Sequence, residues 1–230
     1  MKLRLKFNKC GNLKFISHLD LIRLFQRSFA MANVPIDYSE GFNPHPRFSI
    51  GNPLPLGINS ECEYMDLQLR EEVIPEEIVD SLNRVLPKNI KILGYSLENL
   101  DKNVSRIIEY ALYEFTIYDY DKKFDDIDEF NTKISIWLEN DEIKITRFRK
   151  KKGKKTEIEE NIKEYLESVQ VVSYEDELKI DAIIRNGAEK YLKPELFFEA
   201  LNRDLELGID LNSVYINRVN LFDENMEEII

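Results

Sequence analysis

The two histidines lie among residues that could take part in acid–base or metal chemistry. His18 precedes Asp20 by two positions, and His45 precedes Arg47 by two. Imidazole has an unperturbed pKa of about 6.5, so either histidine could act as a general acid or base, with Asp20 or Arg47 orienting charge. Zinc also accepts imidazole and carboxylate ligands, but His-x-Asp is not a diagnostic spacing. We therefore predict no metal site and no cofactor, and we treat both histidines as candidate catalytic residues of a protein that we expect to be noncatalytic.

Residues 38–57 form a proline-rich segment that could present side chains to a ligand. Four prolines fall between positions 44 and 55, and Pro35 lies just upstream. Proline fixes φ and stiffens an extended path, so such a segment holds its side chains in set directions. The residues suited to stacking on bases or bonding to phosphates and base edges are Tyr38, Phe42, Asn43, His45, Arg47 and Phe48. The alternative is a structural crossover that packs its aromatic rings into the core.

The charges are segregated along the chain, whose formal net charge is −11. Residues 1–60 carry 8 basic against 3 acidic side chains, and residues 144–156 carry 8 against none. If these segments meet in the fold, they form a positive patch suited to phosphate groups. The alternative is a solvated strand pair with a lysine-rich turn. The candidate phosphate-binding lysines of the second segment are Lys150, Lys151, Lys152, Lys154 and Lys155.

A strand and a helix must position the first histidine. Residues 2–8 alternate basic and apolar side chains with the two-residue period of a half-buried strand. After a turn, residues 13–16 are predicted to form a short second strand. Ser17 is a candidate helix N-cap because an acidic residue, Asp20, follows it three positions later. The predicted helix ends near residue 33 and places Arg23 and Arg27 on its polar side, so Asp20, Arg23 and Arg27 are candidate binding residues.

The remaining pattern predicts alternating strands and helices. For the first half we expect strands at 62–69 and 90–95 and a helix from Pro75, and we describe this half as roughly βαββαβ. In the second half we expect strands at 107–118, 134–138, 143–149, 169–173, 178–184 and 214–221, and helices at 124–130, at 158–166 and from Pro194. These patterns predict an α+β protein of two ferredoxin-like (split βαβ) units with antiparallel sheets. The units are residues 1–100, with the motifs, and 101–230, with a lysine-rich hairpin.

The composition is that of a soluble cytoplasmic protein. Apolar residues make up 43% and charged residues 33% of the chain, and no run of 18 apolar residues could span a membrane. The first residues alternate in polarity and lack the continuous apolar run of a secretion signal. Cys10 and Cys62 cannot form a four-ligand metal site alone, and we expect both to be reduced.

Three motifs identify a family resemblance. FISHLDLIRLFQR (15–27), YSEGFNPHPR (38–47) and PLPLG (53–57) resemble, in this order, the radical-SAM-linked domain of unknown function. This bacterial family occurs alone or attached C-terminally to radical SAM proteins. The resemblance places the polar motif positions of the family at His18, Asp20, Arg23, Asn43, Pro44, His45 and Arg47. Residues 31–33 are less basic than in many relatives, and the run at 150–155 departs from the pattern.

The resemblance does not imply radical SAM catalysis by this chain. Its two cysteines cannot form the Cys-x3-Cys-x2-Cys run that holds an iron–sulfur cluster. The favoured hypothesis is a noncatalytic RNA-associated accessory protein, in which Arg23, Arg27, Arg47 and the lysines bind phosphates while aromatic rings stack on bases. The alternatives are a partner module for a separate radical SAM enzyme, or a His-dependent ribonuclease or hydrolase. The expected partners are RNA or a radical SAM protein, and no membrane.

Overall fold

The computed structural model describes residues 1–151 and 154–230, and the side chains of residues 148–155 lie outside this description. The chain forms two compact units: Met1–Tyr110 with Asn217–Ile230, and Ala111–Ile216. The first unit thus includes residues 101–110 and the chain from residue 217 onward, which sequence reasoning assigned to the second half. The physical reason is that Asn217 and Arg218 pair with Asn59 and Ser60 of an early strand.

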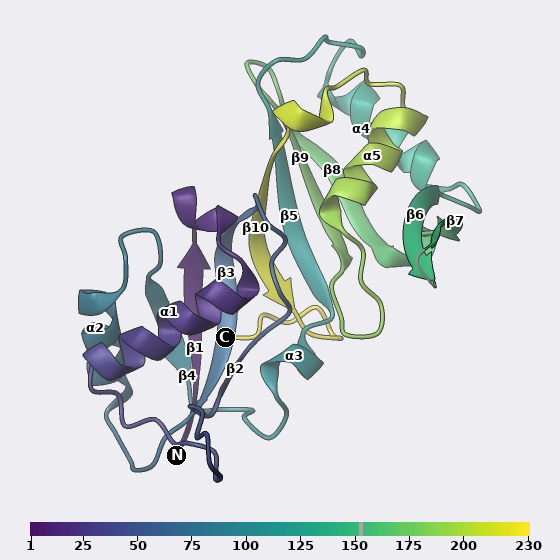
Figure 1. Ribbon diagram of the computed structural model, residues 1–230. Helices are drawn as coiled ribbons and strands as arrows, with labels where there is room; N and C mark the ends of the chain where they lie inside the picture. Colours follow the sequence, from purple (N-terminus) through teal and green to yellow (C-terminus); the bar gives the residue numbers. More distant parts are fainter. Residues whose placement is uncertain (152–153) are drawn as a thin grey trace. The chain divides into compact units, whose positions relative to one another are not determined.

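The first unit has an α+β architecture (Figure 1). Its elements are β1 (Lys2–Lys9), η1 (Gly11–Phe15), α1 (His18–Met31), β2 (Phe48–Ile50), β3 (Asn59–Gln68), α2 (Pro75–Val85), β4 (Ile92–Ser96), α3 (Val104–Ile107) and most of β10 (Tyr215–Phe222). The strand order is β4-β1-β3-β10, with β2 also paired to β3. The β1–β3, β1–β4 and β2–β3 pairs are antiparallel, and the β10–β3 pair is parallel. The described residues show nothing that conflicts with the ferredoxin-like plan.

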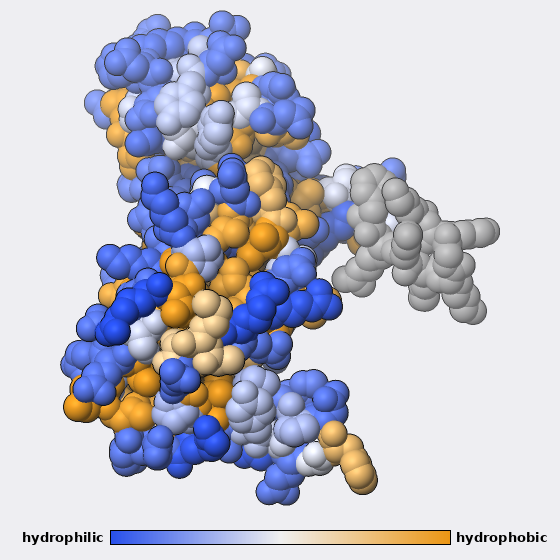
Figure 2. All heavy atoms as spheres, turned by 60° about the vertical axis from the view of Figure 1, so that its left-hand side comes forward, coloured by the Kyte–Doolittle hydropathy of each residue, from blue (hydrophilic) through white to orange (hydrophobic). Residues whose placement is uncertain are grey.

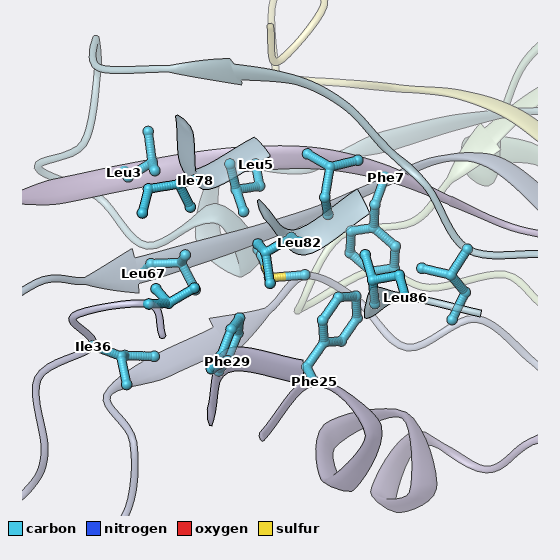
Figure 3. Packing of buried hydrophobic residues seen from close by; sticks show 14 of the residues in the cluster. Leu3, Leu5, Phe7, Phe25, Phe29, Ile36, Leu67, Ile78, Leu82 and Leu86 are labelled. Carbon is cyan, nitrogen blue, oxygen red and sulfur yellow. The ribbon is translucent and has the colours of Figure 1, made fainter. Parts of the chain in front are cut away.

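The core of this unit follows from the two-residue period of β1. Leu3, Leu5 and Phe7 are all fully buried and lie on one face of the strand, where they meet side chains of α1 and α2 (Figure 3). The Phe7 and Phe25 rings pack edge to face with centroids 4.9 Å apart. Leu82 of α2 is also fully buried in this cluster. Burial of this apolar face fixes the two helices on the sheet.

The second unit combines a three-stranded group with a separate hairpin. Its elements are β5 (Tyr110–Ile117), α4 (Ile127–Leu138), β6 (Lys144–Lys151), β7 (Lys154–Asn161), η2 (Lys163–Tyr165), β8 (Leu166–Tyr174), β9 (Leu178–Arg185), α5 (Pro194–Asp204) and η3 (Leu211–Ser213). The strands follow the order β5-β9-β8, and β6 pairs with β7. The α+β class and the predominance of antiparallel pairing are therefore confirmed.

Three predicted elements were wrong. Residues 13–15 belong to η1, which begins at Gly11 with φ +55°, and Ile16 follows it as the C-cap, so this segment forms no strand. Residues 134–138 lie in α4, because Phe130, Ile134 and Trp137 bury one helical face. Residues 158–161 belong to β7 instead of a helix, because β7 pairs with β6 from end to end.

No helix in the described part of the chain is long and apolar enough to cross a membrane.

We expect Phe25→Ala to lower the free energy of unfolding by about 3–5 kcal/mol, because it removes a fully buried ring and leaves a cavity. Phe42→Ala is the matched control, since Phe42 is fully exposed and should leave stability unchanged. Urea unfolding of both variants measures the difference. Equal destabilisation by the two substitutions would contradict this core assignment.

Candidate nucleic-acid interface

The loop of residues 37–47 is anchored by backbone hydrogen bonds at the end of β3. The Asp37 N–H donates to the Gln68 carbonyl at 2.7 Å, and the Gln68 N–H donates to the Arg47 carbonyl at 2.9 Å. The Arg47 N–H donates to the Asp37 carbonyl at 2.7 Å, so the two legs of the loop also bond to each other. Farther out, the Ser39 N–H donates to the His45 carbonyl at 2.9 Å. These bonds give the loop a fixed path, beyond the stiffness that its prolines provide.

The tip of this loop presents side chains to solvent. The Phe42 ring is fully exposed, Tyr38 is 43% exposed, and Asn43 and His45 are exposed. The backbone N–H of His45 donates to Ser39 Oγ at 3.0 Å, which tightens the turn. The loop thus holds rings and polar groups away from the core, as recognition of a ligand requires.

The other two candidates of this segment face the body of the unit. Arg47 is half-exposed, and its Nη1 lies 3.2 Å from Asp37 Oδ2. Phe48 is half-buried and packs edge to face against Phe29, with ring centroids 5.1 Å apart. Arg47 therefore remains accessible beside the loop, whereas Phe48 contributes one face to the core.

A cavity of about 400 Å³ lies beside Arg47. We call it the loop cavity. Two cationic and two carboxylate side chains line it together with amide, hydroxyl and apolar groups, a mixture that suits a polar ligand. The Lys2 ammonium in this wall donates to the Leu100 carbonyl at 3.0 Å. The lining residues are Lys2, Arg47, Phe48, Ser49, Asp66, Leu67, Gln68, Leu100, Asp101 and Asn103.

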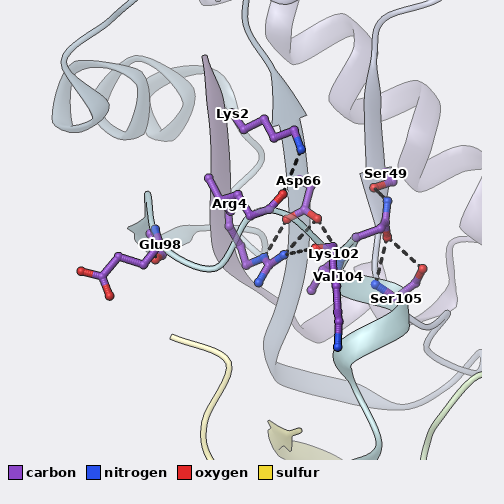
Figure 4. Close-up of polar contacts among 11 residues, drawn as sticks. Lys2, Arg4, Ser49, Asp66, Glu98, Lys102, Val104 and Ser105 are labelled. Carbon is purple, nitrogen blue, oxygen red and sulfur yellow. Dashed lines mark hydrogen bonds and ion pairs between the residues drawn. The ribbon is translucent and has the colours of Figure 1, made fainter.

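A buried ion pair fixes one wall of the loop cavity (Figure 4). Arg4 is fully buried, and its Nε and Nη2 donate to Asp66 at 2.7 and 3.1 Å. The same Nη2 donates to the Lys102 carbonyl at 3.1 Å, and the Val104 N–H donates to Asp66 Oδ2 at 2.8 Å. Asn103 Nδ2 also donates to Ser49 Oγ at 2.7 Å. The segment from Lys102 to Val104 is thereby held against β2 and β3.

The start of α1 satisfies its own polar groups. Ser17 caps the helix, since its Oγ accepts from the Asp20 N–H at 3.1 Å. Ser17 Oγ donates to the Asp20 carboxylate at 2.7 Å, and Arg23 Nη1 donates to it at 3.1 Å. The hydrogen bond from Ser17, and then the one from Arg23, lower the pKa of Asp20 from its ordinary value. Arg23 and Arg27 are exposed on α1.

The structure does not bring the two histidines together. His18 is the first residue of α1 and lies near the start of β3. The nearby Ile16 carbonyl accepts from Lys9, and Lys9 pairs with Ser60 of β3. His45 lies in the loop attached at Gln68, the end of β3. Because a strand rises about 3.3 Å per residue, roughly 26 Å separates these ends of β3.

The lysine cluster belongs to the second unit, whereas the loop belongs to the first. Lys150 pairs with Lys155, and Lys151 pairs with Lys154, across the β6–β7 hairpin. Lys152 lies outside the described residues. The hairpin backbone therefore concentrates lysines at one end of two paired strands.

Sequence reasoning missed a buried charged cluster that contacts Asn52, just before the third motif. Lys9 is 2% exposed, and its Nζ donates to the Ile16 carbonyl at 3.2 Å. Arg218 donates to Glu63 through Nε at 3.0 Å and through Nη2, which also donates to the Asn52 carbonyl at 3.2 Å. Burial lowers the pKa of Lys9, an effect that Glu63 opposes and Arg218 reinforces. The alternation of β1 carries the signal, since Lys9 continues the period of its buried residues.

The cysteines provide no metal centre. Both are free thiols; Cys62 is buried, and its Sγ donates to Asn220 Oδ1 at 3.2 Å. Burial raises the pKa of both Cys10 and Cys62. Among the described residues, no group of three or more His, Cys, Asp or Glu side chains could hold a metal ion.

The comparison with known families matches residues 2–194 to an uncharacterised protein family conserved in bacteria (DUF2344). This chain belongs to that family. The match includes all three motifs, the loop cavity and the lysine-rich hairpin. No curated protein matches the chain.

We expect the free energy of unfolding to rise with pH between the lowered folded-state pKa of Lys9 and its ordinary value of 10.5. In this window the unfolded chain binds more protons at Lys9 than the folded chain does, so a higher pH favours folding. Lys9→Met removes this contribution, and Lys91→Met, at an exposed lysine, is the matched control. Urea unfolding across this pH window measures both. The assignment fails if Lys9→Met keeps the pH dependence of the unmodified protein.

Proposed function

We propose that this chain is a noncatalytic, RNA-associated accessory protein that binds RNA through the loop of residues 37–47 and the loop cavity. The observation that carries this proposal is the fully exposed Phe42 ring on a loop fixed by backbone hydrogen bonds next to Arg47. A fixed loop loses little conformational entropy on binding. The exposed ring has no role in the core, which leaves it available to a ligand.

Each class of side chain at this surface matches one component of single-stranded RNA. Phe42 and Tyr38 provide stacking faces, which contribute about 1–3 kcal/mol per base in proteins that bind single strands. Arg47 and Lys2 provide positive charge for phosphates, and they lie in the wall of one cavity. Asn43 and Gln68 carry amides that can bond to base edges.

Other basic residues extend the proposed phosphate contacts. Arg27 is exposed on α1, and Arg23 is exposed beside Asp20, which neutralises part of its charge. Residues 150, 151, 154 and 155, whose backbone pairs in the β6–β7 hairpin of the second unit, are lysines that remain candidate phosphate contacts on sequence grounds. Such contacts add affinity without sequence preference, so specificity in this proposal comes from the loop.

Arg47→Ala should weaken RNA binding and flatten its salt dependence. Loss of one phosphate contact reduces the slope of log K against log salt by about 0.7 for a single strand. Fluorescence anisotropy with a labelled single-stranded RNA at several salt concentrations measures this slope. Arg84→Ala removes an exposed arginine of α2 and should keep the unmodified slope. Unchanged affinity and slope in Arg47→Ala would refute the role of Arg47.

Phe42→Ala should weaken binding of the same RNA by about 1–3 kcal/mol without changing the salt slope, because it removes stacking but no charge. The same anisotropy titration measures this change.

Crosslinking and sequencing of RNA bound to the tagged protein in its own cells then identifies the ligand. A defined RNA that is recovered with the unmodified protein and lost with an Arg47→Ala, His45→Ala variant supports the proposal. Recovery of no specific RNA refutes it.

A protein partner is the second candidate, favoured by exposed apolar side chains around the start of α1. Phe15 is 64%, Leu19 63% and Leu56 60% exposed, and the Phe15 ring lies against Gly57. Figure 2 shows apolar residues gathered on one face of the first unit, bordered by hydrophilic ones. The family resemblance suggests a separate radical SAM enzyme as this partner. Copurification that Leu19→Asp abolishes would support this candidate, and its absence in the source cells would oppose it.

A further inference from the structure

Another cavity of the first unit, of about 420 Å³, lies next to α3. We call it the α3 cavity. Arg4 contributes to it from β1, and residues 223–229, which follow β10, form much of the remaining wall. Its lining residues are Arg4, Asn99, Asp101, Lys102, Arg106, Ile107, Glu109, Asp223, Glu224, Glu227, Glu228 and Ile229.

The buried end of the α3 cavity offers a hydrogen-bond donor that lacks a protein acceptor. Arg4 is fully buried, and its Nε and Nη2 are used by Asp66 and the Lys102 carbonyl (Figure 4). Arg4 Nη1 is buried and has no hydrogen-bond partner among the described residues. A buried charged donor without an acceptor is unfavourable, so this nitrogen favours an anionic oxygen from a ligand.

The outer part of the α3 cavity has the opposite charge preference. Glu224, Glu227 and Glu228 are exposed carboxylates from one short segment. The segment is folded back on itself, since Phe222 bridges to Glu228 and the Glu227 N–H donates to Asp223 Oδ1 at 2.9 Å. The turn thus holds the backbone of this segment in a defined place, and the exposed carboxylates that it carries favour a cationic group.

We propose that the α3 cavity binds a basic amino acid. The ligand α-carboxylate accepts from Arg4 Nη1, with Lys102 and Arg106 adding positive charge, and the side-chain cation lies among the glutamates. The lining has six acidic and three basic residues, so a ligand of net positive charge is preferred to a neutral one. This site shares neither Arg47 nor the loop of residues 37–47 with the RNA proposal, so the two proposals can fail separately.

Isothermal titration calorimetry of the full chain with L-arginine and L-lysine tests the site. Two analogues separate its halves: agmatine keeps the arginine side chain but lacks the carboxylate, and L-norleucine lacks the side-chain cation. We expect arginine or lysine to bind, and both analogues to bind more weakly. Absence of heat with both amino acids, which would mean that only water fills the cavity, overturns the proposal. Agmatine binding as tightly as arginine also overturns it.

Variants locate any binding that is found. Glu227→Gln combined with Glu228→Gln changes exposed residues and should weaken arginine binding by about fivefold, the upper range for one exposed ion pair. Glu71→Gln combined with Glu72→Gln removes two exposed glutamates outside this cavity and should leave the affinity unchanged.

Arg4→Gln should abolish the preference for arginine over agmatine. If Arg4→Gln does not fold, Arg106→Gln, at an exposed residue, should reduce that preference instead. Equal arginine affinity in the Glu227/Glu228 variant and the unmodified protein overturns the proposal.

Discussion

The polar face of the first unit depends on the ion pair between Arg4 and Asp66. A buried guanidinium is tolerated only when an opposite charge and hydrogen bonds compensate for its lost hydration. The Asp66 carboxylate provides this compensation and also accepts from the Val104 N–H, while Arg4 donates to the Lys102 carbonyl. The pair therefore joins β1 and β3 to the segment from Lys102 to Val104, which lies far along the chain. The loop cavity and the α3 cavity both take part of their walls from that segment.

One strand serves the core and the candidate sites at the same time. In β1 the odd-numbered residues Leu3, Leu5 and Phe7 pack under the helices, and the even-numbered Lys2 and Arg4 line the cavities. A shift of one residue in its pairing with β3 would exchange these faces and expose the apolar set. The free energy of core burial thus specifies the register, and the register places the charged groups. Rigid placement of this kind is what a preorganised binding site needs.

Sequence patterns predicted the parts of the fold that rest on local periodicity. The alternation of β1 and the Ser17 cap are examples, because each depends on residues within a few positions. The strand predicted at residues 134–138 was wrong. Ile134, Ile136 and Leu138 alternate as in a strand, but the buried residues Phe130, Ile134 and Trp137 have helical spacing. The spacing of Ile158 and Ile162 indicated a helix, but pairing with β6 made residues 154–161 a strand. Short apolar patterns are compatible with both periods, and tertiary contacts decide between them.

The candidate sites could likewise be predicted only where their residues are close together in the sequence. The motifs located the loop and Arg47, because proline, aromatic and charged residues are concentrated there in the sequence. They could not locate the cavities, whose walls combine β1 with residues near positions 100 and 225. Arg4 in particular reads as one of several basic residues on the polar face of a strand, a pattern that normally indicates solvent exposure. Only the fold buries it beside the α3 cavity, pairs two of its nitrogens and leaves the third without a protein acceptor, so its chemical role is a property of long-range packing.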